Sequence, residues 1–112
     1  MVDFLDRLQS GRLLSEKSTA FVLKAMEDCE TGPDRLKAGA PKGWMVAHKT
    51  GSSGSWNGLT VATNDVGILT GPAGARISIA VFVGDSKANA AARAAIIARI
   101  AGAAAASYGW TP

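Results

Sequence analysis

The sequence predicts an α+β fold in which helices precede a three-stranded antiparallel sheet and a C-terminal helix packs on that sheet. Three observations support this prediction. Apolar residues recur at helical spacing before residue 43, the period changes to strand-like alternation over residues 44–84, and an alanine-rich helical pattern follows over residues 85–107. The 112 residues suffice for one compact domain, so residues 1–112 are expected to form a single unit.

Residues 1–43 contain the predicted N-terminal helices and a loop. Residues 2–9 carry apolar side chains at three-residue spacing, which indicates a short helix that ends at a Ser-Gly pair. Ser15 is suited to cap a second helix that reaches Cys29, and we expect the cysteine on its buried apolar side. Residues 34–43 are loop-like, with room for one helical turn.

Three extended segments predict the sheet, because apolar alternation and turn residues delimit each of them. Residues 44–51 form the first, and residues 58–70 form a longer second whose Asn64-Asp65 pair predicts an irregularity. A Gly-Pro-Ala-Gly turn then leads to residues 76–83, where isoleucine and valine alternate cleanly.

The last helix, over residues 85–107, is expected to begin at Asp85 or Ser86. Its predicted buried stripe consists of Ala92, Ile96 and Ile100.

Composition argues against several classes of partner. The net charge is +3, but the twelve basic residues are scattered singly, so a nucleic-acid partner is not expected. One cysteine and the absence of a Cys/His cluster argue against an internal disulfide, a structural metal or another cofactor.

No stretch approaches the roughly 18 apolar residues of a membrane span. The first nine residues carry acids and no apolar core, so they do not resemble a signal peptide.

The stretch HKTGSSGS, residues 48–55, concentrates the polar chemistry. Alternation in a strand places Lys49 and Gly51 on one face and Thr50 on the other. A glycine there lets another group approach the backbone, and the following hydroxyls suit an anion or an extended substrate. The same letters also suit a strand end followed by a polar turn, with the lysine in solvent.

The flanking residues add a family resemblance. HKTGSSG followed by ATND, with LLSEKSTAFVLKAM and TGPDRLKAGAPKGW before it, resembles the C-terminal part of a class A β-lactamase over residues 4–101. The KTG triplet is a known motif of these enzymes and of penicillin-binding proteins. The resemblance implies a partial β-lactamase/transpeptidase-like fold, a β-lactam substrate, and a periplasmic or secreted location for the parent enzyme.

The resemblance also implies roles for individual positions. Lys49 corresponds to the lysine of the active-site strand, whose charge favours the substrate's carboxylate. The backbone N–H of Ser52 corresponds to the donor that completes the oxyanion hole.

Four positions correspond to substrate contacts. Thr50 would hydrogen-bond the carboxylate, Gly51 would leave room for the substrate, and Ser52 and Ser53 would line the same edge. Arg35 resembles an arginine that some members direct at the carboxylate from the preceding loop; it could equally be a solvated loop arginine.

Other chemically active side chains have simpler interpretations. We expect His48, the only histidine, to be structural, and Asp65 to be a hydrogen-bonding carboxylate rather than a catalytic base. Trp44 and Trp56 are expected to pack at the core or its rim.

Three parts that the family's chemistry requires are missing. The sequence contains no SxxK, no SDN and no glutamate in a family-like catalytic loop, so we expect no enzymatic rate from the chain alone. The predicted sheet would leave an apolar face and a strand edge open, which predicts self-association or binding of a complementary N-terminal fragment. Two alternatives are a penicillin-binding-protein or esterase relative, and a non-catalytic binding or assembly domain.

Overall fold

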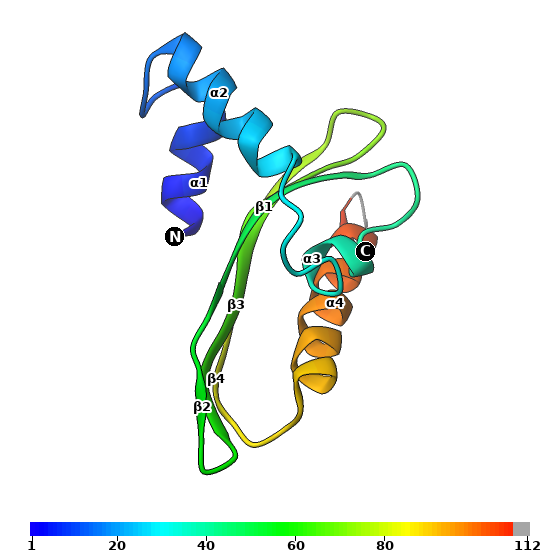
Figure 1. The fold of residues 1–112 in the computed structure, drawn as a ribbon. Helices are drawn as coiled ribbons and strands as arrows, with labels where there is room; N and C mark the ends of the chain where they lie inside the picture. Colours follow the sequence, from blue (N-terminus) through cyan, green and yellow to red (C-terminus); the bar gives the residue numbers. More distant parts are fainter. Residues whose placement is uncertain (109–112) are drawn as a thin grey trace.

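A computed structural model describes residues 1–108, which form four helices and four strands (Figure 1). In chain order the elements are α1 (Val2–Gln9), α2 (Glu16–Glu27), α3 (Leu36–Gly39), β1 (Met45–Ser52), β2 (Ser55–Trp56), β3 (Leu59–Thr70), β4 (Arg76–Ser86) and α4 (Ala90–Ser107). The helix-first, sheet, final-helix order confirms the predicted α+β class.

The sheet is antiparallel and is built around β3. β1 and β4 pair with β3 over most of its length, so that Asp65 lies between Thr50 and Val81. The two-residue β2 pairs with the start of β3 and continues the side occupied by β1. The sheet therefore has four strands rather than the predicted three, because Ser53 and Gly54 interrupt the pairing and separate β2 from β1.

A tight hairpin joins β2 to β3. Asn57 and Gly58 both have positive φ, 52° and 76°, which matches the mirror-image turn that suits strand twist. This turn projects Trp56 into solvent with 80% of its surface exposed, so the predicted packing of Trp56 is wrong. Trp44, in contrast, packs against the core as expected.

The predicted irregularity at Asn64-Asp65 is also wrong. Both residues pair in register with β1 and with β4. The Asp65 side chain is satisfied by hydrogen bonds within the fold, so the strand needs no bulge to release it.

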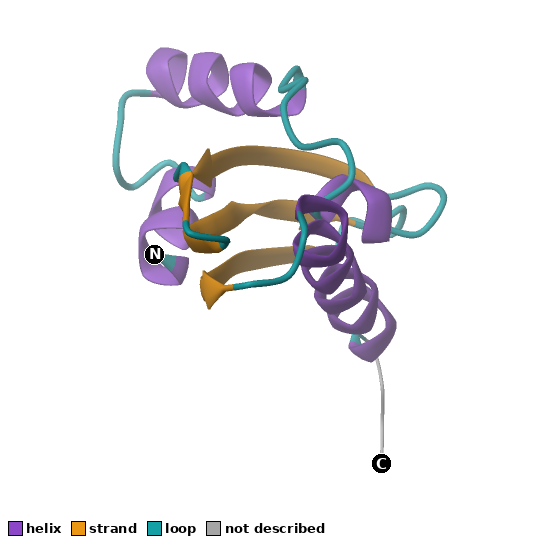
Figure 2. Cartoon of the chain, turned by 60° about the horizontal axis from the view of Figure 1, so that its bottom comes forward, coloured by secondary structure: helices purple, strands orange, loops and turns teal. Residues whose placement is uncertain are grey.

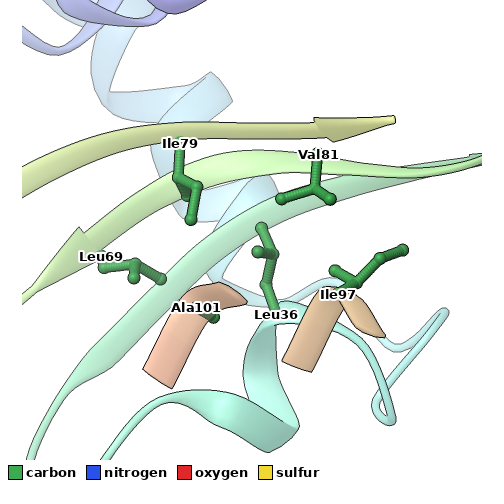
Figure 3. Packing of buried hydrophobic residues seen from close by; sticks show 6 residues of the cluster. All are labelled: Leu36, Leu69, Ile79, Val81, Ile97 and Ala101. Carbon is green, nitrogen blue, oxygen red and sulfur yellow. The ribbon is translucent and has the colours of Figure 1, made fainter. Parts of the chain in front are cut away.

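Helices cover both faces of the sheet. α3 and α4 lie on one side, and α1 and α2 lie on the other (Figures 1 and 2). The core lies between the sheet and the α3–α4 side, where the alternating residues of β4 point as predicted (Figure 3). Its buried members are Leu36, Leu69, Ile79, Val81, Ile97 and Ala101.

The start and the buried stripe of α4 both differ from prediction. β4 continues through Ser86, and the helix is capped by Asn89, whose side chain accepts the Ala92 N–H at 2.8 Å. The buried stripe is Ala94, Ile97, Ala101 and Ala105.

The predicted stripe residues Ile96 and Ile100 lie largely exposed, at 42% and 43%. The choice of face follows from the contact with α3, because a Cβ on Gly39 would lie 1.8 Å from the Ala98 carbonyl oxygen. Only small residues permit this approach, and several faces of the alanine-rich helix are apolar enough to compete.

By length and composition alone, α4 could also span a membrane, although core helices of soluble proteins meet the same criterion. Here its buried stripe packs against the sheet.

The second helix confirms its predicted start. The Ser15 hydroxyl accepts the Ser18 N–H at 3.1 Å. The helix ends at Glu27, so Cys29 follows it in a half-buried loop instead of lying on its buried side as predicted. The thiol contacts Thr31 there, because the chain turns back towards β1.

The α1–α2 side contains a large apolar groove of about 880 Å³. Its walls come mainly from the first two helices and its floor from β1 and β3. The lining includes Phe4, Leu13, Leu14, Phe21, Val22, Met26, His48 and Lys49. Phe21 is 75% exposed at the rim.

Candidate functional site

The residues predicted as a site lie along β1 and at the bend that follows it. In register with β3, Lys49 lies opposite Val66 and Thr50 lies opposite Asp65. Lys49 and Gly51 therefore occupy the face that carries α1 and α2, and Thr50 and Ser52 occupy the face that carries α3 and α4. The predicted alternation of these side chains is confirmed.

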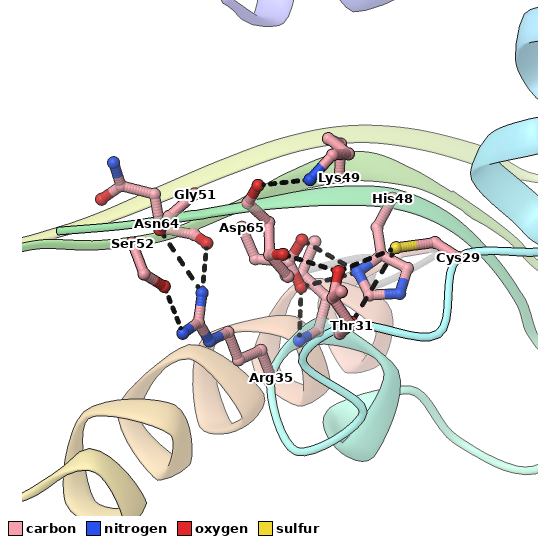
Figure 4. A network of polar contacts seen from close by, with 11 residues as sticks. Cys29, Thr31, Arg35, His48, Lys49, Gly51, Ser52, Asn64 and Asp65 are labelled. Atoms are coloured by element: carbon pink, nitrogen blue, oxygen red, sulfur yellow. Dashed lines mark hydrogen bonds and ion pairs between the residues drawn. The ribbon is translucent and has the colours of Figure 1, made fainter. Parts of the chain in front are cut away.

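Lys49 is exposed and borders the apolar groove. Its Nζ donates to the Thr50 carbonyl at 2.9 Å, so the amine folds back over the strand (Figure 4). The lysine thus provides a solvent-accessible positive charge beside β1.

The Thr50 hydroxyl lies 2.7 Å from the hydroxyl of Thr31, in the loop before α3. A hydroxyl has one donor and two acceptor positions. If Thr31 donates in this contact, the Thr50 O–H remains available to donate to an anion. Sequence reasoning missed Thr31, since its place beside β1 depends on the path of the loop.

Arg35 reaches the end of β1 from the same loop (Figure 4). Its guanidinium donates to the Ser52 hydroxyl at 2.7 Å and to the carbonyls of Asn64 and Gly51 at 2.9 and 3.4 Å. Protein groups at the end of β1 therefore hold the guanidinium. The structure brings Arg35, Gly51 and Ser52 together.

Ser53 is turned towards β3 instead of towards open solvent. Its N–H donates to the Ala62 carbonyl at 2.9 Å, and its hydroxyl accepts the Ala62 N–H at 3.0 Å. These contacts fix the bend between β1 and β2 and shape the end of the polar edge.

His48 and Asp65 form a buried pair beneath this edge. They are 1% and 0% exposed, and His48 Nδ1 lies 2.9 Å from both carboxylate oxygens. Asp65 also accepts the Leu36 N–H at 3.1 Å. Both residues thus have the structural environment that the sequence predicted.

Gly32 is a further residue that sequence reasoning missed. Its φ is +56°, and an added Cβ would lie 2.6 Å from Cγ2 of Thr50. The loop therefore presses directly on β1, and a larger residue would displace it. The Thr-Gly-Pro sequence predicted a turn, but it did not predict this contact.

The assembled edge has two cationic side chains, one on each face of β1, and hydroxyl groups between them. Such donors suit a carboxylate or another anion of an extended ligand. Within residues 1–108, no group of three or more His, Cys, Asp or Glu side chains could hold a metal ion.

The sequence and the fold match one enzyme family. The pattern of the Beta-lactamase enzyme family covers residues 1–108. β-Lactamase VEB-1 of Pseudomonas aeruginosa is 50% identical over 91 residues, which cover 81% of this chain and 30% of VEB-1.

Solved structures agree with this match. A β-lactamase from Chitinophaga pinensis superposes with a TM-score of 0.91 at 45% identity, over 95% of this chain and 39% of that one. A representative class A β-lactamase from Bacteroides cellulosilyticus gives 0.84 at 38% identity, over 89% and 36%.

The chain belongs to the β-lactamase enzyme family, and its relatives place it with class A. It spans about a third of the length of the curated relatives that it matches.

Proposed function

We propose that this chain supplies the substrate-binding strand and part of the oxyanion hole of a class A β-lactamase active site, whose nucleophile comes from another part of the enzyme. The single observation that carries the proposal is the polar edge of β1, where Lys49 lies on one face of the strand and Thr50 and Ser52 lie on the other. The guanidinium of Arg35 lies beside the same edge.

The chemistry of that edge suits the carboxylate of a β-lactam. Lys49 and Arg35 offer charge-assisted donors, and the hydroxyl of Thr50 can donate once Thr31 donates to it. Gly51 carries no Cβ that would block a ligand beside the strand, and a Cβ there would meet nothing within 4 Å. We assign the Ser52 N–H to the oxyanion and Ser53 to the shape of the edge.

These 112 residues hold no serine followed three positions later by lysine. A β-lactamase of this family requires that nucleophile, an SDN loop and a glutamate that activates water. We therefore expect the chain alone to bind substrate weakly and to lack enzymatic turnover. The periplasm or the extracellular space is the corresponding place of action.

The apolar groove favours a complementary portion of the same enzyme as the partner. The matched relatives have about two thirds of their length outside the region that this chain covers. An open apolar groove of about 880 Å³ with exposed aromatic side chains at its rim is typical of a surface that binds a partner. The rest of the β-lactamase chain is therefore the expected occupant, and a second copy of this chain would compete for the same surface.

Covalent labelling with a fluorescent penicillin tests the proposal. The chain is mixed with the portion of VEB-1 that lies outside the matched 91 residues, and each is also tested alone. Label should appear only in the mixture and only on the VEB-1 portion. Lys49→Ala should abolish it, whereas Lys87→Ala, which changes an exposed lysine outside the site, should not. Label that survives in Lys49→Ala would overturn the assignment of β1.

One observation favours a second candidate, a non-catalytic assembly domain. The walls of the groove come mainly from the first two helices, and of Lys49, Thr50 and Ser52 only Lys49 borders it. This candidate predicts that the VEB-1 portion binds the chain but that the mixture never reacts with penicillin.

A further inference from the structure

A carboxylate lies buried in the middle of the sheet, directly below the candidate site. Asp65 has no exposed surface and belongs to β3, where β1 and β4 flank it. Burial of a charged carboxylate is unfavourable unless hydrogen-bond donors replace water. Here the donors are specific ones: the imidazole of His48 (Figure 4) and the backbone N–H of Leu36.

His48 approaches Asp65 from the neighbouring strand. Because the carboxylate accepts, Nδ1 carries the hydrogen in this contact, at 2.9 Å from each oxygen. The other ring nitrogen, Nε2, is buried without a hydrogen-bond partner among the described residues. His48 therefore directs its polar contact at Asp65 and supports the orientation of that carboxylate.

The Leu36 contact connects this pair to the candidate site. Leu36 is fully buried and begins α3, and the residue before it is Arg35. While the Leu36 N–H is held by Asp65, the Arg35 guanidinium donates to the carbonyl of the adjacent Asn64 at 2.9 Å. Two consecutive residues, Arg35 at the end of the loop and Leu36 at the start of α3, are thus bonded to two consecutive residues of β3.

We propose that Asp65, supported by His48, is a positioning residue that holds the base of Arg35 so that its guanidinium meets the ligand edge of β1. This inference rests on the proposed substrate-binding function of that edge. Arg35 has a long side chain with several rotatable bonds, so its direction depends on a fixed backbone. The backbone at Arg35 is non-helical, with φ −99° and ψ −125°, and α3 is too short to fix it alone.

Nuclear magnetic resonance of the chain itself tests the positioning directly. In Asp65→Ala the Leu36 amide should exchange at least about tenfold faster, because its acceptor is lost. The Arg35 guanidinium signals should become averaged in the same variant. Asp65→Asn should restore both, since its carbonyl oxygen can accept the Leu36 N–H and its amide can donate to the other tautomer of His48.

Two further variants keep this test decisive. Asp85→Asn removes an exposed carboxylate and should leave the Leu36 and Arg35 signals unchanged. If Asp65→Ala does not fold, His48→Phe keeps a ring at the buried position, removes the donor to Asp65 and should loosen both signals partially. Unchanged Leu36 exchange and Arg35 signals in a folded Asp65→Ala or His48→Phe would overturn the proposal.

Kinetics of the mixture with the complementary VEB-1 portion provide the second test. Arg35→Ala and Asp65→Ala should each raise KM for nitrocefin about tenfold, with a smaller change in kcat. Arg35→Ala removes the charge-assisted contact to the substrate's carboxylate, and Asp65→Ala weakens the same contact because Arg35 is no longer held in place. The double variant should show no more than the Arg35→Ala effect. Independent, multiplying effects would contradict positioning. If the unmodified mixture shows no turnover, the proposed function fails, and the magnetic resonance result still decides the role of Asp65.

Discussion

The two faces of the sheet differ in how completely their apolar side chains are buried. On the α3–α4 face, Leu36, Leu69 and Ile97 are completely buried and interlock with the sheet. On the α1–α2 face, the helices enclose an open groove with Phe4 and Phe21 at its rim. One face holds a closed core, and the other leaves apolar surface open. Stability of this chain should therefore depend mainly on the first face, and assembly on the second.

The largest effect should come from breaking the closed core. Ile97→Ala should lower the free energy of unfolding by about 3 kcal/mol, because it removes a fully buried side chain and leaves a cavity. Ile96→Ala makes the same chemical change on the exposed side of the same helix and should cost less than about 1 kcal/mol. Urea unfolding monitored by circular dichroism measures both. Equal losses would mean that α4 packs through another face in solution.

The next effect sharpens the contrast at the open groove. Phe21→Ser should change the stability of the isolated chain by less than about 0.5 kcal/mol, since the side chain is largely exposed. Binding to the complementary VEB-1 portion should weaken at least about tenfold, because an aromatic anchor is lost. Calorimetric titration measures the affinity.

Trp56→Ser provides the comparison for that variant, because Trp56 is equally exposed but lies outside the groove. It should bind as the unmodified chain does. Sedimentation of the chain alone adds a further check, since self-association that depends on Phe21 would identify a second copy as a competing occupant of the groove.

The smallest effect concerns the start of α4. Asn89→Ala should cost about 1 kcal/mol, because the Ala92 N–H loses its cap. Ser86→Ala, at one of the two residues that the sequence indicated as a cap, should cost less than half of that, since Ser86 belongs to β4. Thermal unfolding distinguishes the two, and a larger loss at Ser86 would place the helix start where the sequence first indicated.

These differences show what local sequence could and could not predict. The alternation in β4 and the Ser15 cap were readable because each depends on neighbours in the chain. The buried side of α4 was not, because alanine makes several faces equally apolar and the contact between Gly39 and Ala98 decides among them. The local sequence says little about which face of a helix is buried when tertiary packing alone selects that face.

The candidate site also combines features that the local sequence predicted with features that it did not predict. The faces of Lys49 and Thr50 follow from strand alternation and were predicted. The contacts of Arg35 with Ser52 and of Thr31 with Thr50 depend on the path of a loop across the strand edge, which no periodicity encodes. The family resemblance pointed to Arg35, whereas its attachment through Leu36 and Asp65 emerged only from the fold.

The central claim is that β1 is one wall of a β-lactam site whose nucleophile lies elsewhere in the enzyme. Nitrocefin hydrolysis by the chain, by the complementary VEB-1 portion and by their mixture tests it most directly. We predict turnover only in the mixture, and its loss on Lys49→Ala. Turnover by the chain alone that survives Lys49→Ala would contradict the claim, because a nucleophile outside this scheme would then reside on these 112 residues.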